Sequence, residues 1–507
     1  MLIATAVVGG GLTALAYAPT RWLPLLLFGP SLGLWAAARS DSPRWGAACG
    51  LAYGLAFSAL EFRWMFEVDP VAGLLLPAVE SVFWAVPGAV AAAATRLPIG
   101  WWVAATASAW TLAEAARARA PLTGFEWGQL AMAAAPTPLR PAVSIVGALG
   151  LTALLAAVAA GLATLALGGR RRYLPLVVAL ALTAAATGVG RIELTSPAGA
   201  LDVAVVQVDD PCPGAFAEDC PGYGEELLRD YVTGTAALDG TSDLVLWGED
   251  ALPGAEALPD VGERIRALTG GLPAPLLAGV GTPAAPGRFL RWAALFDRDG
   301  TSLGGYAKRE PVPFGEYVPL RSVLGGISDV GRLVPSDLEP GVDTSPVVVS
   351  TDGDQVPLGT TVSWEVTFSR LVRDVAVGAD GLATLTTVSS YGTSGTSDQL
   401  LDAAQLRAAE HQKPMVVAAT TGRSTLIDPA GARVASSALF RADTLSGTLQ
   451  LRSGLTPFAR FGDVPTLLLA LLVLASALVV RRRAGSRPMV AASARDAAER
   501  ASDTVAT

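Results

Sequence analysis

The stretch Tyr306-Ala-Lys308-Arg-Glu-Pro-Val-Pro-Phe-Gly-Glu316-Tyr-Val-Pro319 is the most distinctive part of this chain. Its prolines hold the backbone to a rigid path, because each proline ring locks its own φ angle. That path carries a lysine, Lys308, and a carboxylate, Glu316. A single lysine is usually only a solvated charge, but within this run we expect Lys308 to have a function.

Two further segments place a polar residue directly after a predicted strand. Glu249 follows the apolar run Leu244–Trp247, and Ser363 follows a run that ends in Thr-Thr-Val. A strand end presents the next side chain at the rim of its sheet, so a solvated loop carboxylate is the weaker interpretation of Glu249. Catalysis through a covalent intermediate needs a nucleophile, a base and positive charge near the developing oxyanion. Ser363, Glu249 and Lys308 supply one candidate for each.

The composition is that of a membrane protein with a soluble portion. Of the 507 residues, 51% are hydrophobic and only 16% are charged, and the mean hydropathy is +0.44. An ordinary soluble protein is less apolar than this. The apolar residues are concentrated in residues 1–190. The net charge is −8 and no basic patch stands out, which argues against a nucleic-acid partner.

The counts of histidine and cysteine exclude some kinds of site. His411 is the one histidine, so a multi-histidine metal centre is impossible and a Ser-His-Asp triad would have to use it. We expect His411 to be solvated at a helix end, and we expect neither a metal nor a cofactor. Cys49 lies in an apolar span, where we expect it to pack. Cys212 and Cys220 flank a Pro/Gly-rich loop, where a disulfide in an oxidising compartment and two unpaired thiols both fit the sequence.

Eight stretches approach the length of about 20 apolar residues that one helix needs to cross a bilayer. The predicted spans are 2–18, 22–38, 46–64, 72–94, 99–117, 142–168, 173–189 and 464–480. Arginines cluster after the second, fourth, sixth and eighth spans, and positive residues favour the cytoplasmic side. All four clusters then fall on one face. This pattern predicts cytoplasmic termini and an outward-facing segment over 190–462.

The chain therefore divides into four predicted parts. Residues 1–190 form a membrane domain of about seven helices, and 464–480 form a C-terminal membrane helix. Residues 481–507 are predicted to be a disordered cytoplasmic tail. Between them, residues 199–455 alternate β-branched runs with helical patterns, which predicts a layered α/β domain. The predicted strands begin at 201, 243, 276, 356, 383 and 415, and the predicted helices are 225–238, 261–269, 369–377 and 399–410.

In their order and spacing, the segments around Glu249, Lys308 and Ser363 resemble the Glu–Lys–Cys frame of the nitrilase superfamily. With hydrophobic helices on both sides, the chain is most similar to the membrane-bound branch of that superfamily, the apolipoprotein N-acyltransferases. The resemblance implies an α-β-β-α sandwich beside a multi-span α-helical membrane domain. It implies that Glu249 is the general base, that Lys308 stabilises the tetrahedral intermediate, and that Glu316 and Glu365 support the site.

The main departure from the family is Ser363, which stands where the family has its cysteine nucleophile. A free thiol has a pKa near 8.5, and an alcohol lies several units higher, so a frame suited to a thiolate leaves a serine mostly protonated. Serine–lysine enzymes need a neutral lysine, whereas carboxylates beside Lys308 would keep it charged. Two interpretations stay open: Glu249 removes the proton in concert with attack by Ser363, or the site is slow or catalytically silent.

A second resemblance lies in the membrane domain. Trp110-Thr-Leu-Ala-Glu114-Ala-Ala-Arg117 and Gly124-Phe125-Glu126-Trp127 resemble a Trp–Glu–Arg helix end and a Gly-Phe-Pro-Trp loop of the family, with Glu126 in place of the proline. The resemblance makes Glu114, Arg117, Phe125 and Trp127 candidates for lining a lipid path. Alternatively, Glu114 and Arg117 simply pair, since they are three apart on one helical face. Glu80 lies inside a predicted span, where an acid is a functional candidate, and the sequence does not name its partner.

The function implied by the resemblance is transfer of a fatty acyl chain from a phospholipid to the N-terminal amine of a diacylglyceryl-modified lipoprotein. The implied partners are the phospholipid donor, the lipoprotein acceptor and membrane lipid, with no cofactor. The implied location is the cell membrane, with the catalytic domain outside. The alternative is a silent homologue that binds lipid or lipoprotein, or that partners an active paralogue. A membrane-tethered amidase is a third interpretation, which eight spans do not favour.

Overall fold

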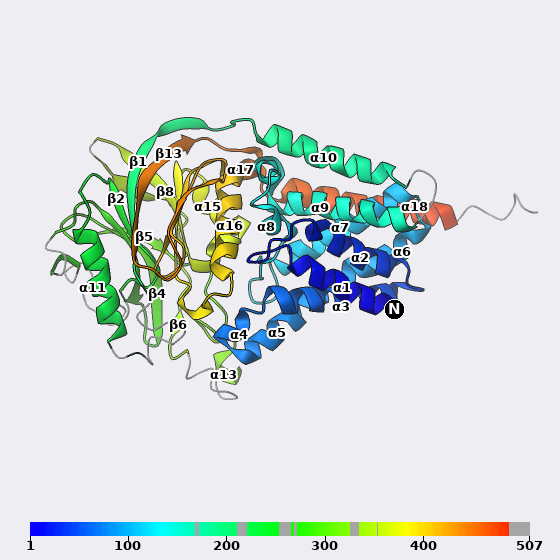
Figure 1. Ribbon diagram of the computed structural model, residues 1–507, viewed down its shortest axis with the longest axis horizontal. Helices are drawn as coiled ribbons and strands as arrows, with labels where there is room; N and C mark the ends of the chain where they lie inside the picture. Colours follow the sequence, from blue (N-terminus) through cyan, green and yellow to red (C-terminus); the bar gives the residue numbers. More distant parts are fainter. Residues whose placement is uncertain are drawn as a thin grey trace, which may run out of the picture.

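A computed structural model describes residues 1–167, 172–209, 220, 222–252, 265–267, 271–324, 334–351 and 353–485. In these residues a bundle of helices and an α/β portion lie end to end along the long axis of the molecule (Figure 1). The bundle is built from both ends of the sequence, and the α/β portion comes from the middle. This arrangement confirms the predicted fold class.

Each predicted span overlaps at least one helix of the bundle, and two short helices, 65–68 and 130–134, lie between the spans. The helices of the bundle are α1 (Leu2–Ala14), α2 (Leu25–Ala38), α3 (Pro43–Glu61), α4 (Met65–Val68), α5 (Pro70–Ser81), α6 (Ala85–Ala93), α7 (Ile99–Arg117), α8 (Leu130–Ala134), α9 (Val143–Leu167), α10 (Leu174–Gly190) and α18 (Val464–Gly485). Among the described residues, the helical segments 70–96, 140–167 and 464–483 are long and apolar enough to cross a membrane. The apolar helices α1, α2 and α10 are shorter. The number and direction of membrane crossings therefore stay predictions.

Glycines let the helices of the bundle approach one another closely, as is common between membrane helices. A Cβ atom on Gly10 of α1 would lie 2.1 Å from the carbonyl oxygen of Tyr53 in α3. A Cβ atom on Gly50 of α3 would lie 2.1 Å from the carbonyl oxygen of Trp84. Neither position accepts a side chain without moving a backbone. The ring centroid of Trp84 in turn lies 4.6 Å from that of Trp110 in α7.

The α/β portion contains two sheets in the part of the chain that the structure describes. The first runs in the order β13-β1-β2-β3-β4-β5, with β6 paired to β4, and the second runs β12-β11-β10-β9-β8-β7. The strands are β1 (Ser196–Gln207), β2 (Leu244–Trp247), β3 (Leu276–Pro283), β4 (Arg288–Phe296), β5 (Ser302–Ala307), β6 (Asp337–Leu338), β7 (Val347–Ser350), β8 (Gln355–Val362), β9 (Gly381–Thr386), β10 (Met415–Ala419), β11 (Thr425–Ile427), β12 (Arg433–Ser436) and β13 (Asp443–Ser453). All six predicted strands are present. Strands β1, β2 and β3 are parallel to one another, and so are β8, β9 and β10.

The central strands are buried on both faces, which explains their continuous apolar sequences. Every residue of β2, β9 and β10 is buried. Side chains of the two sheets form one shared core, to which Leu246 and Leu385 belong. The helix α11 (Tyr223–Ala236) packs on the outer face of the first sheet, and α15 (Ser369–Ala376) and α16 (Thr396–His411) pack on the second (Figure 1). The layers are those of an α-β-β-α sandwich.

The predicted helices of this portion match α11, α15 and α16. The predicted helix 261–269 and Cys212 lie mostly or wholly outside the described residues, so the possible disulfide to Cys220 stays a prediction. One expectation was wrong: His411 is not solvated, because only 1% of it is exposed. The helix α16 lies between the second sheet and the bundle, so its end is covered from both sides (Figure 1). The ring of His411 lies 5.9 Å from that of Phe458.

Polar contacts cross from α16 to the bundle. A carboxylate oxygen of Glu410 accepts a hydrogen bond of 2.8 Å from the backbone nitrogen of Ala148 in α9. Ala148 follows Gly147, whose φ of +70° interrupts the helix and frees that backbone nitrogen. The α/β portion therefore caps a break in a bundle helix, which helps to fix the position of the second sheet relative to the bundle.

Candidate active site

Lys308 lies at the centre of a buried cluster of charges at the edge of the first sheet. It directly follows β5 and is fully buried. Its Nζ atom lies 2.7 Å from Oε1 of Glu316 and 3.3 Å from Oε1 of Glu249. Burial alone would lower the pKa of Lys308, but the two carboxylates outweigh it and the pKa is raised. Lys308 is therefore a fixed positive charge and not a base.

Glu249 is oriented by a backbone donor from the second sheet. It lies two residues after β2, and 1% of it is exposed. Its Oε2 atom accepts a hydrogen bond of 3.1 Å from the backbone nitrogen of Thr387, which follows β9. The ends of two parallel strands, one from each sheet, therefore meet at this carboxylate. This is the rim position that the apolar strand before Glu249 predicts.

Glu316 is held by the proline-rich segment itself. Its Oε2 atom accepts a hydrogen bond of 2.8 Å from the backbone nitrogen of Val312, four residues earlier. Its Oε1 atom contacts Lys308. Burial would raise the pKa of Glu316, but Lys308 and Arg291 outweigh burial and hold the pKa below its usual range. The rigid segment thus presents an ionised carboxylate to the lysine that begins it.

Ser363 occupies a sharp turn directly after β8. Its φ angle is +60°, a left-handed conformation that a residue with a side chain rarely adopts. Such strained positions cluster at functional sites, where the surrounding structure holds them. The turn leads into the short helix 363–367. A strand end followed by a strained residue and a helix is the local geometry that exposes the nucleophile of α/β-hydrolases.

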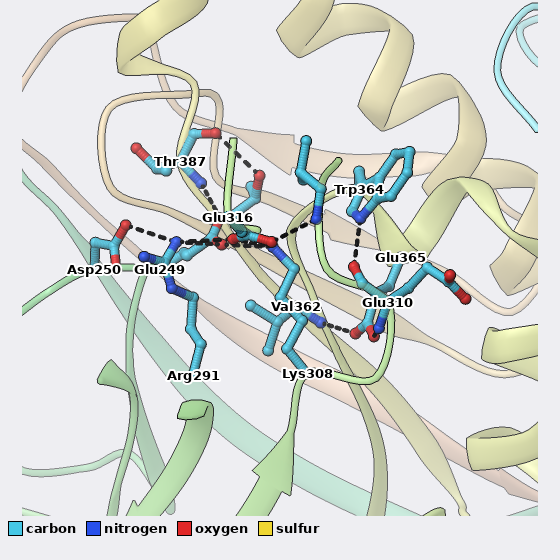
Figure 2. A network of polar contacts seen from close by, with 12 residues as sticks. Glu249, Asp250, Arg291, Lys308, Glu310, Glu316, Val362, Trp364, Glu365 and Thr387 are labelled. Atoms are coloured by element: carbon cyan, nitrogen blue, oxygen red, sulfur yellow. Dashed lines mark hydrogen bonds and ion pairs between the residues drawn. The ribbon is translucent and has the colours of Figure 1, made fainter. Parts of the chain in front are cut away.

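Glu365 ties the turn at Ser363 to the segment of Lys308. Its Oε2 atom accepts a hydrogen bond of 2.8 Å from the backbone nitrogen of Val362. Its Oε1 atom accepts bonds of 2.7 Å from the backbone nitrogen of Arg309 and 3.1 Å from the hydroxyl of Tyr306. One carboxylate thus binds the residue before the serine and the residue after the lysine. Figure 2 shows Glu365 on one side of Lys308, with Glu249 and Glu316 on the other.

Two charged residues of the cluster were missed from the sequence. Nη1 of Arg291, in β4, lies 3.0 Å from Asp250, 3.1 Å from Glu316 and 3.4 Å from Glu249. Figure 2 shows Arg291 and Asp250 beside Glu249. Arg291 stands in a strand that the sequence did not reveal. Asp250 could have been recognised from the sequence as a candidate, because it directly follows Glu249.

Phe125 and Trp127, two candidates for a lipid path, lie where the bundle meets the α/β portion. The ring centroids of Phe125 and Trp364 are 6.4 Å apart. Trp364 directly follows Ser363 in the sequence, so the loop that carries Phe125 lies near the turn of Ser363. Trp127 lies 5.0 Å from Trp64, and Trp64 lies 5.2 Å from Tyr391. Aromatic side chains therefore line the contact between the two portions. Their role in a lipid path stays a prediction.

Glu114 and Arg117, the other two candidates, form a buried ion pair of 2.6 Å within α7. Arg117 also lies 3.1 Å from Glu80, which gives Glu80 the partner that the sequence could not name. In addition, Nη1 of Arg117 donates to the carbonyl oxygens of Phe125 and Trp127, at 3.0 and 2.6 Å. The contacts made by Arg117 hold the aromatic loop in place.

In the described ranges, no group of three or more His, Cys, Asp or Glu side chains has an arrangement that could hold a metal ion. The candidate site brings carboxylates and fixed cations next to the turn of Ser363, and these are groups that nucleophilic catalysis uses. The three residues that the sequence groups as catalytic come from the ends of β2, β5 and β8.

Comparisons with known proteins agree with both portions. Residues 9–161 match the family model described as apolipoprotein N-acyltransferase N-terminal domain, and residues 216–454 match the model described as carbon-nitrogen hydrolase. An apolipoprotein N-acyltransferase of Chromobacterium violaceum is 31% identical, over 95% of this chain and 95% of its own length. One of Shewanella oneidensis is 27% identical, over 91% of this chain and 92% of its own. A solved amidase of Nesterenkonia sp. AN1 covers 52% of this chain and 98% of its own, with 19% identity and a TM-score of 0.35.

Proposed function

Because this chain belongs to the apolipoprotein N-acyltransferase family, we propose that it transfers a fatty acyl chain from a phospholipid to the N-terminal amine of a diacylglyceryl-modified lipoprotein. The observation that carries the proposal is the buried contact of Lys308 with Glu249 and Glu316. Glu365 joins this cluster to the turn of Ser363 through backbone hydrogen bonds. These contacts support Ser363 as the nucleophile.

In the first half-reaction, Oγ of Ser363 attacks the ester carbonyl carbon of the phospholipid while Glu249 accepts the hydroxyl proton. The carbonyl oxygen gains negative charge, which the cation of Lys308 stabilises. The bond from the carbonyl carbon to the glycerol oxygen then breaks, and that oxygen takes the proton from Glu249. A lysophospholipid leaves, and an acyl ester stays on Ser363.

In the second half-reaction, the neutral amine of the lipoprotein attacks the acyl ester. An amide bond forms, the bond to the oxygen of Ser363 breaks, and Glu249 carries the amine proton to that oxygen. The serine is restored, so donor and acceptor react in turn, as in ping-pong kinetics. Glu249 is the base in both steps because Lys308 is held charged by its carboxylates.

The protein is a membrane protein, and we propose that its α/β domain lies outside the cell membrane with both termini in the cytoplasm. The proposed parts are the membrane domain 1–190, the catalytic domain 199–455, the C-terminal span 464–480 and the tail 481–507. The placement of arginines supports this orientation, because they gather after alternate spans. In this orientation the aromatic loop of Phe125 and Trp127 would meet the catalytic domain at the outer surface.

The test uses the purified full-length protein, incubated with a phospholipid that carries an isotope-labelled acyl chain. Mass spectrometry should find the label on Ser363, and addition of a diacylglyceryl lipopeptide should move it to the peptide amine. Ser363→Ala should lose the label, whereas Ser389→Ala, which removes a hydroxyl from the segment after β9, should keep it. No label on the native protein would overturn the proposed reaction. If label then appeared in Ser363→Cys, the protein would be a silent homologue with an intact frame.

A further inference from the structure

Arg291 contacts all three carboxylates of the charge cluster, and the proposed reaction gives it no role. A single nitrogen, Nη1, lies within 3.0 to 3.4 Å of carboxylate oxygens on Asp250, Glu316 and Glu249. Lys308 reaches only the two glutamates. The backbone oxygen of Arg291 also accepts a hydrogen bond of 2.8 Å from the backbone nitrogen of Lys308, so the two cationic residues lie side by side on neighbouring strands.

The count of charges shows what Arg291 contributes. With every group ionised, the cluster has three carboxylates and two cations, and therefore one excess negative charge. Without Arg291 the excess would be two, in a place where Glu249 is 1% exposed and Lys308 is fully buried. Like charges that share a buried site favour protonation of one of them. Loss of Arg291 would therefore oppose the negative charge that Glu249 needs as a base.

Asp250 completes the pair from the solvent side. Its carboxylate lies 3.0 Å from Arg291, and 39% of its side chain is exposed, more than any other member of the cluster. Its φ of +56° turns the chain sharply after Glu249. Burial and the neighbouring glutamates raise the pKa of Asp250 to about 6, although Arg291 opposes them.

We propose that Arg291 and Asp250 are a positioning pair in which Arg291 keeps Glu249 negatively charged and oriented for acyl transfer. Arg291 balances the charge of the two glutamates, and the carboxylate of Asp250 holds Arg291 and offsets part of its charge. Both residues act through Glu249. The inference rests on the proposed function, because it assigns Glu249 the part of the base. The other titratable groups whose charges act on members of the cluster are Tyr231, Glu365 and Tyr391.

The test measures the rate of acyl labelling at residue 363 against pH, in full-length protein and in both the native and Ser363→Cys backgrounds. Arg291→Gln should move the acidic limb of the profile upward by about one to three pH units. Asp250→Asn should move it downward. The double variant has the same net charge in the cluster as the native protein and should return the limb toward its native position.

Two matched variants separate charge from structure. Arg291→Lys keeps a cation, and because only Nη1 makes the contacts, it should keep the limb near its native pH. Arg288→Gln removes an exposed cation from the same strand and should leave the profile unchanged. If Arg291→Gln lowered thermal stability but left the acidic limb where it was, Arg291 would be structural only and the proposal would be overturned.

A second measurement does not depend on acyl transfer. In the Ser363→Cys background, alkylation of the new thiol by iodoacetamide follows the thiolate form. Arg291→Gln should raise the pH at which alkylation becomes fast, Asp250→Asn should lower it, and the double variant should cancel the two shifts. This order without acyl label would support the pair and overturn the proposed reaction. Acyl label with no shift in either profile would support the reaction and overturn the pair.

Discussion

Arg117 in α7 forms an ion pair of 3.1 Å with Glu80 in α5, and both side chains are 2% exposed. Arg117 also binds Glu114 and two carbonyl oxygens of the loop that carries Phe125 and Trp127. A buried charge of this kind is costly unless it is paired and hydrogen-bonded. The pair therefore explains why an acid is tolerated inside the bundle: it is part of the support for the aromatic loop.

Arg117→Met should destabilise the protein strongly, because it leaves Glu80 and Glu114 buried without a cation. Removal of one partner of a buried pair costs about 3–5 kcal/mol. Thermal unfolding in detergent should show the loss. Arg119→Met is the control, since 44% of that side chain is exposed, and it should change the melting temperature little. Equal melting temperatures for the two variants would contradict a role for Arg117 in stability.

Glu365→Ala should disconnect the turn of Ser363 from the segment of Lys308. It leaves the backbone nitrogens of Val362, Arg309 and Glu310 without their acceptor. An unsatisfied buried group costs about 1–3 kcal/mol, so the variant should be destabilised and should lose acyl labelling. Glu365→Gln keeps one acceptor oxygen and should lose less stability. The two variants are compared by chemical denaturation and by labelling, and identical losses in both would argue against the hydrogen bonds as the cause.

Stability should depend on pH through Glu410. Burial raises the pKa of Glu410 from its ordinary 4.5 to about 8, although Arg407 opposes the rise. A pKa raised in the folded state means that the contribution to stability is full below pH 4.5 and is lost as pH rises through 8. Unfolding free energies measured across this window should therefore fall with rising pH. Glu410→Gln should flatten the slope, and an unchanged slope would assign it to other groups.

Gly147→Ala should destabilise the break in α9. Its φ is +70°, and an added Cβ atom would lie 2.5 Å from the ring of Phe458. Overpacking in a closely packed interior costs about 1–3 kcal/mol. Gly188→Ala in α10 is the matched control, because a Cβ atom there would meet nothing within 4 Å. Gly147→Ala should therefore lower the melting temperature, whereas Gly188→Ala should not, since alanine favours a regular helix. Equal melting temperatures for the two variants would contradict this account.

Local sequence patterns predicted much of the fold and the core of the site. Apolar strands that end at Trp247 and Val362, and the proline-rich run after Lys308, predict which side chains reach the sheet edge. The six predicted strands were found because each contains a buried, apolar stretch. The helical spans were found because their sequences are apolar over the length that a membrane-crossing helix needs. These features depend on residues that are neighbours in the sequence.

What the sequence could not show depends on contacts between distant segments. Arg291 lies in β4, between β3 and β5, and its local sequence is equally compatible with an outward-facing side chain. Its partners come from the ends of other elements. Likewise, the burial of His411 follows from the bundle that covers α16 and not from the local helix-end pattern. Only the folded structure shows which residues contact one another and whether a helix is covered on a second side.

The strands β1 and β13 pair along almost their whole length, although β1 is the first strand of the α/β portion in the sequence and β13 is the last. The first sheet is therefore incomplete until residues 443–453 have left the ribosome. Pairing of two strands so far apart in the sequence is slow. Strand β13 ends at Ser453 and helix α18 begins at Val464, so this apolar helix is synthesised soon after the strand that completes the sheet. Biogenesis of this chain would then be most vulnerable in the interval before its final strand arrives, while the edge of β1 is unpaired and open to aggregation.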